Sequence, residues 1–269
     1  MLRLIVFTDL DGTLLDHHSY DYFPALPALE RLRRADAPLV MVSSKTRLEI
    51  EALRQDLHNG DPFIPENGGA ICIPESYDLP IPGKAVKMGP YHVIVLGKTA
   101  AEISPLFDRL AEKYPVRALS RMTAVDISRL TGLTVDQAET ARNREFGEAF
   151  LLDDPQIPET DLEKAVKDLG LRLTRGGRFY HLLGENDKGK AVTLLTDMYQ
   201  RKWGNVTTVG IGDAPNDLPL LAAVDHPFLV ASPDGKHRDI ELPGLTRVPL
   251  PGPAGFNQAV NELMDRLSS

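Results

Sequence analysis

LIVFTDLDGTLL, residues 4–15, is the stretch of this sequence that decides the fold. Its short, unbroken apolar run is typical of a parallel strand that helices cover on both faces. Gly12 indicates that the chain turns just after the strand. Asp9 and Asp11 then stand at the carboxyl end of a buried strand, the edge where open α/β sheets bind ligands. The alternative is a strand followed by an ordinary Asp-Gly turn. Because neighbouring carboxylates repel each other, we favour a site with a cation or a catalytic task.

Polar residues also follow two other predicted strands. Ser43 and Ser44 come directly after the apolar run 37–42, and a helix is predicted from about Leu48 to Leu57. A hydroxyl at such a position suits a phosphate, although a role as helix N-cap explains Ser43 equally well. Asp213 follows the apolar run 206–212 in the sequence GDAPND. The sequence therefore predicts that carboxylates and hydroxyls meet at one sheet edge.

These residues make chemical sense together. Several carboxylates at one edge require a hard dication, and oxygen ligands of this kind suit Mg²⁺. Lys188 opens a predicted helix, and its ammonium would offset the remaining negative charge and hold a phosphoryl oxygen. A lone lysine at a helix start is otherwise a solvated side chain. The combination predicts a magnesium-dependent site for a phosphorylated substrate.

Composition limits the possible partners and locations. The chain has 269 residues, 42% of them hydrophobic and 25% charged, as in an ordinary globular protein. The formal net charge of −8 argues against a nucleic-acid partner. Cys72 is the only cysteine, so we expect no intrachain disulfide and a reducing compartment. No apolar window approaches membrane length, and no signal-peptide pattern is visible. We expect a cytoplasmic protein without a membrane partner.

The middle of the chain follows a different pattern. Residues 75–89 are rich in proline and glycine and predict a linker. Strand patterns at 91–96, 116–119, 150–152, 171–174 and 178–182 then alternate with helical patterns at 100–114, 134 onward and 159–169. This is an α+β module of the size of a small domain. We predict a first core part at 1–82, an inserted domain at 83–184 and a second core part at 185–269.

The ordered set DLDGT, Ser43, Lys188 and GDAPND resembles the four motifs of the haloacid dehalogenase (HAD) superfamily of phosphatases. The resemblance implies a Rossmann-like α/β core with a parallel sheet. It also implies Asp9 as nucleophile, Asp11 as general acid and base, and Ser43 and Lys188 as phosphate ligands. The same resemblance implies Mg²⁺ bound by Asp9, by the carbonyl of Asp11 and by Asp213. Asn216 and Asp217 are expected to support these ligands without binding the ion directly.

The insertion between Ser43 and Lys188 resembles the type-2 (C2) cap of HAD sugar-phosphate phosphatases. The nearest family is the mannosyl-3-phosphoglycerate phosphatases, on the segments VSSKTR, PENGGAI, RNREFGEAF (142–150) and GGRFYHLLGENDKGKA. Ala149 departs from the family pattern, which often has proline there. The resemblance implies hydrolysis of a phosphorylated glycosyl-glycerate.

Such a substrate carries a carboxylate beside its phosphate, so its site needs further cations. The arginine fork suits a carboxylate better than the lysine point charge does. The alternative for each arginine is a solvated surface side chain. The predicted substrate-binding residues are Ser44, Lys45, Asn67, Gly68, Gly69, Arg142, Arg144, Glu148 and Arg178.

Other functions remain open from the sequence. A broad hexose-phosphate phosphatase, a glucosyl-3-phosphoglycerate phosphatase or a phosphomutase would share the aspartate pair. A catalytically idle phosphosugar-binding regulator is a further alternative from another class. The expected partner is a small phosphorylated sugar or glycerate, and the chain is expected to be a monomer or homodimer.

Overall fold

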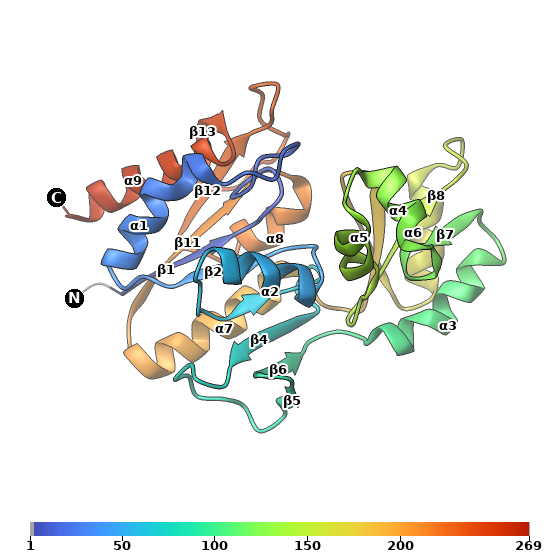
Figure 1. Ribbon diagram of the computed structural model, residues 1–269, viewed down its shortest axis with the longest axis horizontal. Helices are drawn as coiled ribbons and strands as arrows, with labels where there is room; N and C mark the ends of the chain where they lie inside the picture. The colour runs from blue at the N-terminus through green and yellow to red at the C-terminus, as the bar shows by residue number, and fades with distance from the viewer. Residues whose placement is uncertain (1–2, 269) are drawn as a thin grey trace.

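The computed structural model describes residues 3–268, which form a larger α/β body with a smaller module beside it (Figure 1). The strands of the larger body are β1 (Arg3–Thr8), β2 (Leu39–Val42), β3 (Phe63–Ile64), β4 (Ala70–Pro74), β5 (Val86–Met88), β6 (Tyr91–Val95), β11 (Val206–Gly212), β12 (His226–Ala231) and β13 (Thr246–Pro251). They form a nine-stranded sheet in the order β13-β12-β11-β1-β2-β3-β4-β6-β5. Pairing is parallel from β13 to β3 and antiparallel from β3 to β5.

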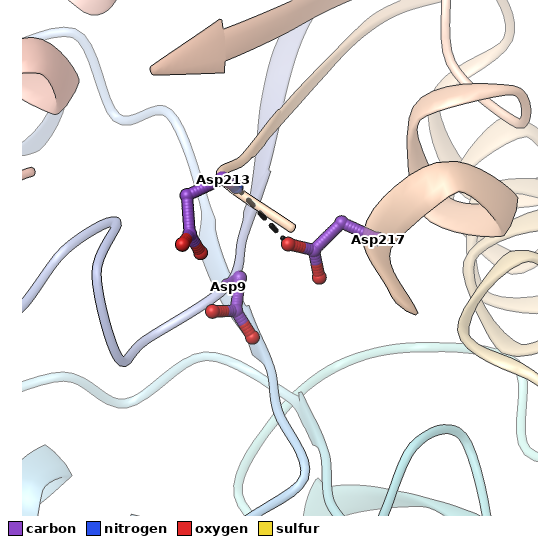
Figure 2. A group of neighbouring side chains, drawn as sticks. All are labelled: Asp9, Asp213 and Asp217. Atoms are coloured by element: carbon purple, nitrogen blue, oxygen red, sulfur yellow. Dashed lines mark hydrogen bonds between the residues drawn. The ribbon is translucent and has the colours of Figure 1, made fainter. Parts of the chain in front are cut away.

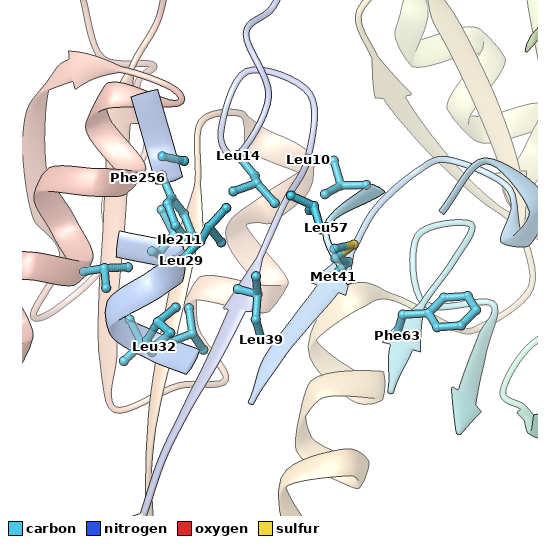
Figure 3. Packing of buried hydrophobic residues seen from close by; sticks show 14 of the residues in the cluster. Leu10, Leu14, Leu29, Leu32, Leu39, Met41, Leu57, Phe63, Ile211 and Phe256 are labelled. Atoms are coloured by element: carbon cyan, nitrogen blue, oxygen red, sulfur yellow. The ribbon is translucent and has the colours of Figure 1, made fainter. Parts of the chain in front are cut away.

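Helices cover both faces of this sheet, as the unbroken apolar strands predict. One face packs against α1 (Leu26–Arg34), α2 (Arg47–Asp56) and α9 (Ala254–Ser268), and the other against α7 (Lys188–Trp203) and α8 (Leu218–Leu221). Ile5 and Phe7 point to the α7 side, whereas Val6 points to the α1 side. Figure 3 shows Leu29 and Leu32 of α1 with Phe256 of α9 packed over the α1 side. The predicted Rossmann-like core is confirmed.

The smaller module, called the cap below, has its own core. Its strands β7 (Val116–Ala118), β8 (Glu148–Leu152), β9 (Arg172–Gly176) and β10 (Phe179–Leu183) form an antiparallel sheet in the order β7-β8-β10-β9. Helices α3 (Ala100–Ala111) and α6 (Glu159–Asp168) pack on one face of this sheet. Helices α4 (Ala124–Thr131) and α5 (Val135–Arg142) lie on the other. Short 3-10 turns occur at Phe23–Ala25, Leu119–Arg121 and Pro215–Asp217.

Two local expectations differ from the structure. The strand predicted at 91–96 is β6, and it pairs with β4 of the large sheet instead of belonging to the inserted module. The predicted linker 75–89 carries β5, which extends the same sheet. We therefore propose that the cap begins after Val95 and not at residue 83. Helix α4 was absent from the prediction.

The two connections between core and cap pass side by side. A Cβ on Gly97 would lie 1.9 Å from Oδ1 of Asn186, and a Cβ on Gly184 would lie 2.6 Å from the backbone nitrogen of Lys98. Glycine at these positions therefore allows the two connecting segments to approach each other closely. Within residues 3–268, none of the helices is long and apolar enough to cross a membrane.

Candidate active site

The pairing of β1 with β11 brings the first and last acidic motifs together. The parallel register sets Thr8 beside Ile211, and the backbone nitrogen of Asp9 donates to the Ile211 carbonyl at 2.9 Å. Asp9 and Asp213 follow these two strands, so both lie at the carboxyl edge of the sheet. Figure 2 shows their carboxylates facing the same space, with Asp217 beside them. The predicted meeting of motifs at this edge is present.

Lys188 lies between two carboxylates. Its Nζ donates to Oδ1 of Asp9 and to Oδ1 of Asp217, each at 2.6 Å, and all three side chains are buried. The other oxygen of Asp217 accepts hydrogen bonds from the backbone nitrogens of Asp213 at 3.1 Å and Ala214 at 3.2 Å. Both oxygens of Asp217 are thus engaged, and this residue fixes the loop after β11.

The acidic cluster fits a hard dication. One ligand oxygen from each of Asp9, Asp213 and Asp217 lies within 4.8 Å of the other two. Because Asp217 is already engaged by Lys188 and the loop backbone, Asp9 and Asp213 are the better candidate ligands. Thr13 orients Asp213 by donating from Oγ1 to Oδ1 at 3.2 Å. Oδ1 of Asp11 is buried without a hydrogen-bond partner among the described residues, as expected of a site completed by a ligand.

Burial changes the charge state of this cluster. Removal from water and repulsion by Asp217 raise the pKa of Asp9 well above its usual value, although Lys188 opposes the shift. The same two causes raise the pKa of Asp213 to about 7. Burial opposes the charge on Lys188, but the neighbouring carboxylates outweigh it and the pKa of its ammonium is raised. With all its carboxylates ionised the cluster carries excess negative charge, which a dication would neutralise.

The segment after β2 contributes to the same edge. Ser43 is buried, and its Oγ accepts from the backbone nitrogen of Lys45 at 3.2 Å. The N-cap of α2 is Thr46, so the alternative role of Ser43 as helix cap does not apply. Nζ of Lys45 lies 2.9 Å from Oδ2 of Asp11 and 4.9 Å from the centre of the Tyr20 ring. Lys45 is therefore the cation next to the second aspartate of the first motif.

A cavity with a volume of about 440 Å³ lies between the core and the cap. Its core side includes Asp9, Asp11, Ser44, Lys45, Asp213 and Asn216. Its cap side includes Arg144, Arg178, His181 and an apolar wall of Leu119, Ile127, Leu133, Ala149 and Phe179. The cavity thus joins an acidic edge with cationic and apolar cap residues.

The predicted arginines occupy different positions. Arg144 lines the cavity and ties cap to core: its Nη2 donates to the Ser44 carbonyl at 2.9 Å. Its Nε lies 3.3 Å from Glu66, close enough for an ion pair but without hydrogen-bond alignment. Arg178 lines the cavity from an exposed turn, and its guanidinium donates to the Leu130 carbonyl. Arg142 lies outside the cavity lining and is held by Glu139 and the Met122 carbonyl.

Glu148 lies on the opposite face of the cap sheet from the cavity. It pairs across the strands with Leu182, on the face that packs against α3 and α6, and its carboxylate accepts from Ser120 Oγ at 2.5 Å. Burial raises its pKa. One position along, Ala149 faces the cavity. Glu148 is therefore not brought to the predicted sugar-binding surface.

The Asn67-Gly68-Gly69 turn joins core elements and is not part of the cavity lining. A Cβ on Gly68 would lie 2.2 Å from the Asp187 carbonyl oxygen, and one on Gly69 2.4 Å from Cβ of Phe146. The preceding Glu66 is fully buried and accepts from the backbone nitrogens of Glu145 at 2.8 Å and Phe146 at 3.2 Å. The turn positions the cap segment next to α7.

Some residues of the site were missed from the sequence. Thr13 stands within the first motif, but no role was assigned to it. Tyr20 and the neighbouring His17 and His18 lie in an exposed loop and line the cavity. His181 lines it from β10. Its signal was available, since a histidine that alternates with the apolar Tyr180 and Leu182 points to the other face of a strand.

Comparisons with known proteins identify relatives of this chain. Residues 6–87 match the family described as haloacid dehalogenase-like hydrolase. A glucosyl-3-phosphoglycerate/mannosyl-3-phosphoglycerate phosphatase from Persephonella marina is 37% identical, over 98% of each chain. A protein of the same name from Methanococcoides burtonii is 40% identical, over 98% of each chain. A HAD phosphatase structure from Bacteroides thetaiotaomicron, 18% identical, has a TM-score of 0.67 over 98% of this chain and 96% of its own.

Proposed function

This chain is a phosphatase and belongs to the haloacid dehalogenase-like hydrolases, and we propose that it hydrolyses a glycosyl-3-phosphoglycerate to the glycosylglycerate and phosphate. The names of the two relatives support both the glucosyl and the mannosyl substrate. The expected reaction is phosphomonoester hydrolysis through an aspartyl-phosphate.

In the proposed reaction Asp9 attacks phosphorus in line. A bond forms between its carboxylate oxygen and phosphorus, and the bond from phosphorus to the glycerate oxygen breaks. Asp11 donates a proton to that leaving oxygen and then takes a proton from the attacking water. The water oxygen bonds to phosphorus, and the carboxylate of Asp9 is released. Ser43 and Lys188 hold the phosphoryl oxygens.

Asp9, Asp213 and the backbone of Asp11 would hold Mg²⁺. The ion, when bound, neutralises the charge of the carboxylates and the phosphate. Lys188 keeps Asp9 in place by the 2.6 Å contact between its Nζ and Oδ1. Asp217 in turn keeps Lys188 in place, also at 2.6 Å. This chain of contacts orients the nucleophile before the substrate arrives.

The observation that carries the proposal is the single cavity that joins Asp9 and Asp213 to cations on both sides. A phosphoglycerate glycoside carries phosphate and carboxylate charges close together, which requires more than one cation. Lys45 from the core and Arg144 and Arg178 from the cap line the cavity. The apolar cap wall suits the C–H face of a sugar. A plain aryl phosphate would use only the core edge.

Kinetics of the purified protein with Mg²⁺ test the proposal. Phosphate release would be measured on mannosyl- and glucosyl-3-phosphoglycerate, 3-phosphoglycerate, glucose 6-phosphate, mannose 6-phosphate and 4-nitrophenyl phosphate. We expect kcat/KM for one or both glycosides to exceed the other values by about tenfold or more, a difference of about 1.4 kcal/mol.

Each alternative gives a different result. Hexose phosphates cleaved as well as the glycosides would indicate a broad sugar phosphatase. Activation by a sugar bisphosphate, with transfer instead of release, would indicate a mutase. Binding of the glycosides without phosphate release, with Mg²⁺ present, would indicate a regulator and overturn the proposal.

A further inference from the structure

His181 is placed by strand alternation on the cavity face of the cap sheet. Its neighbours Tyr180 and Leu182 point the other way, into the apolar core under α3 and α6. Phe179, two positions before it, lines the same cavity, and so does Ala149, its partner across the strand pair. His181 is thus the polar member of an otherwise apolar strip facing the active site.

The imidazole of His181 is buried but lacks a hydrogen-bond partner. Only 5% of the residue is exposed, and Nδ1 is buried with no partner among residues 3–268. Native proteins rarely leave a buried polar atom unpaired, so a ligand or water is expected there. Burial and the nearby charges of Arg144 and Lys188 lower the pKa of His181 to about 3. The ring is therefore neutral, with one donor and one acceptor nitrogen.

Space for a ligand group lies directly next to this ring. A Cβ built on Gly176 would stand 3.6 Å from Nε2 of His181 and 4.0 Å from Oγ of Ser44. Gly176 does not have a positive φ, so its backbone does not require glycine. The missing side chain leaves space for an additional group between His181 of the cap and Ser44 of the core.

We propose that His181 is a specificity-determining residue that hydrogen-bonds a hydroxyl of the sugar in the glycosyl-3-phosphoglycerate. This inference rests on the proposed function. A hydroxyl both donates and accepts, which matches a neutral imidazole, whereas a carboxylate can only accept. The glycerate carboxylate is better matched by the cations Lys45 and Arg144, which line the same cavity.

The test compares two substrates that differ only in the sugar. The glycosyl-3-phosphoglycerate and 3-phosphoglycerate share the phosphate and the carboxylate, so a contact with the sugar affects only the first. His181→Leu should lower kcat/KM for the glycoside about tenfold and change the value for 3-phosphoglycerate by less than about twofold. His181→Asn keeps a donor and an acceptor near the Nδ1 position and should restore at least half of the lost activity, on a logarithmic scale.

Two further variants separate a ligand contact from a packing role. His92→Leu is the matched control, because His92 lies on β6 and is not part of the cavity lining. This variant should leave kcat/KM unchanged for both substrates. Gly176→Ala leaves the imidazole intact but adds a methyl 3.6 Å from Nε2, and should likewise lower kcat/KM for the glycoside alone. Thermal unfolding of each variant shows whether the cap is intact.

The outcomes are distinct. The role of His181 is overturned if His181→Leu lowers kcat/KM equally for both substrates, or does not lower it for the glycoside. It is also overturned if His181→Asn is as impaired as His181→Leu and Gly176→Ala has no effect. Failure of the proposed function gives a separate result, since the wild type itself would then not prefer the glycoside. In that case the effect of His181 is measured on the best sugar phosphate against 4-nitrophenyl phosphate.

Discussion

The core side and the cap side of the cavity hold their polar groups in different ways. On the core side Asp9, Lys188 and Asp217 contact one another directly, at 2.6 Å for each lysine contact. On the cap side His181 has no hydrogen-bond partner within residues 3–268 and Arg178 donates to a backbone carbonyl. Arg144 contacts the core at the Ser44 carbonyl and Glu66. A network in which each charge holds the next is orientated for one reaction. Separate polar groups on the apolar cap wall are suited to selecting the leaving group without changing the core chemistry.

The strongest test of this contrast removes the proposed nucleophile, Asp9, from the core side. Asp9→Asn should lower kcat on every phosphate ester by about 10⁵-fold or more, because no other core carboxylate can take its place. The adduct formed with fluoroberyllate should be found on Asp9 by crystallography of the wild type. Asp234→Asn, an exposed aspartate far along the chain, is the control and should keep full activity. An adduct on another residue would contradict the assignment.

A second change tests whether the core charges hold one another. Lys188→Met leaves Asp9 and Asp217 buried without their shared cation, which should cost about 3–5 kcal/mol of unfolding free energy. Urea denaturation at pH 7.5 without Mg²⁺ measures it. Lys190→Met is a matched control two residues on, at an exposed position. If the two variants unfold at the same urea concentration, the core network does not contribute to stability.

A smaller effect comes from the protonation of Asp213. Its pKa is about 7 in the folded chain, against about 4 unfolded, so its contribution to stability is complete below pH 4 and is lost as pH rises to 7. Without metal, the free energy of unfolding of Asp213→Asn relative to the wild type should therefore increase by about 1–2 kcal/mol when the pH is raised from 5.5 to 7.5. Mg²⁺ at pH 7.5 should stabilise the wild type and not the variant. A thermal shift by Mg²⁺ of equal size in both would show that Asp213 is not a ligand.

The smallest expected effect separates two arginines of the cap. Arg178 lines the cavity but is exposed, so Arg178→Ala should cost about 0.5–1 kcal/mol in kcat/KM for the glycoside, roughly two- to fivefold. Arg142→Ala removes the same charge outside the cavity and should leave this value unchanged. The ratio of kcat/KM for the glycoside to kcat/KM for 4-nitrophenyl phosphate, measured at two salt concentrations, separates a local contact from a general charge effect. Equal losses in both variants would mean that the cap acts only through its net charge.

The same contrast explains what the sequence could predict. The predicted core residues Asp9, Asp213 and Lys188 each follow a buried strand or open a helix, and parallel pairing takes such positions to one edge. Their proximity therefore follows from local patterns. The Rossmann-like core and the inserted α+β module were predicted for the same reason, since their elements are strongly periodic.

The cap residues depend on register, which local patterns do not fix. Glu148 and Ala149 are neighbours in sequence, yet a one-residue difference on a strand sends them to opposite faces. We propose a later start for the cap because the edge strand β6 pairs with β4 in an antiparallel extension of the core, which the local pattern did not indicate. Asn67, Gly68 and Gly69 were assigned to substrate, but the two glycines are needed for close packing against Asp187 and Phe146.

The pairing of β1 with β11 has a consequence for how the chain folds. Thr13 and Asp213, which meet at this edge, are separated by 200 positions. The entropy of closing so long a loop grows only with the logarithm of its length, about 0.6 kcal/mol for each doubling. The equilibrium thus tolerates the inserted cap, whereas the folding rate falls with such distant contacts. The acidic edge exists only after β1 and β11 pair, so a nascent chain reaches it late, once most of its length has been synthesised.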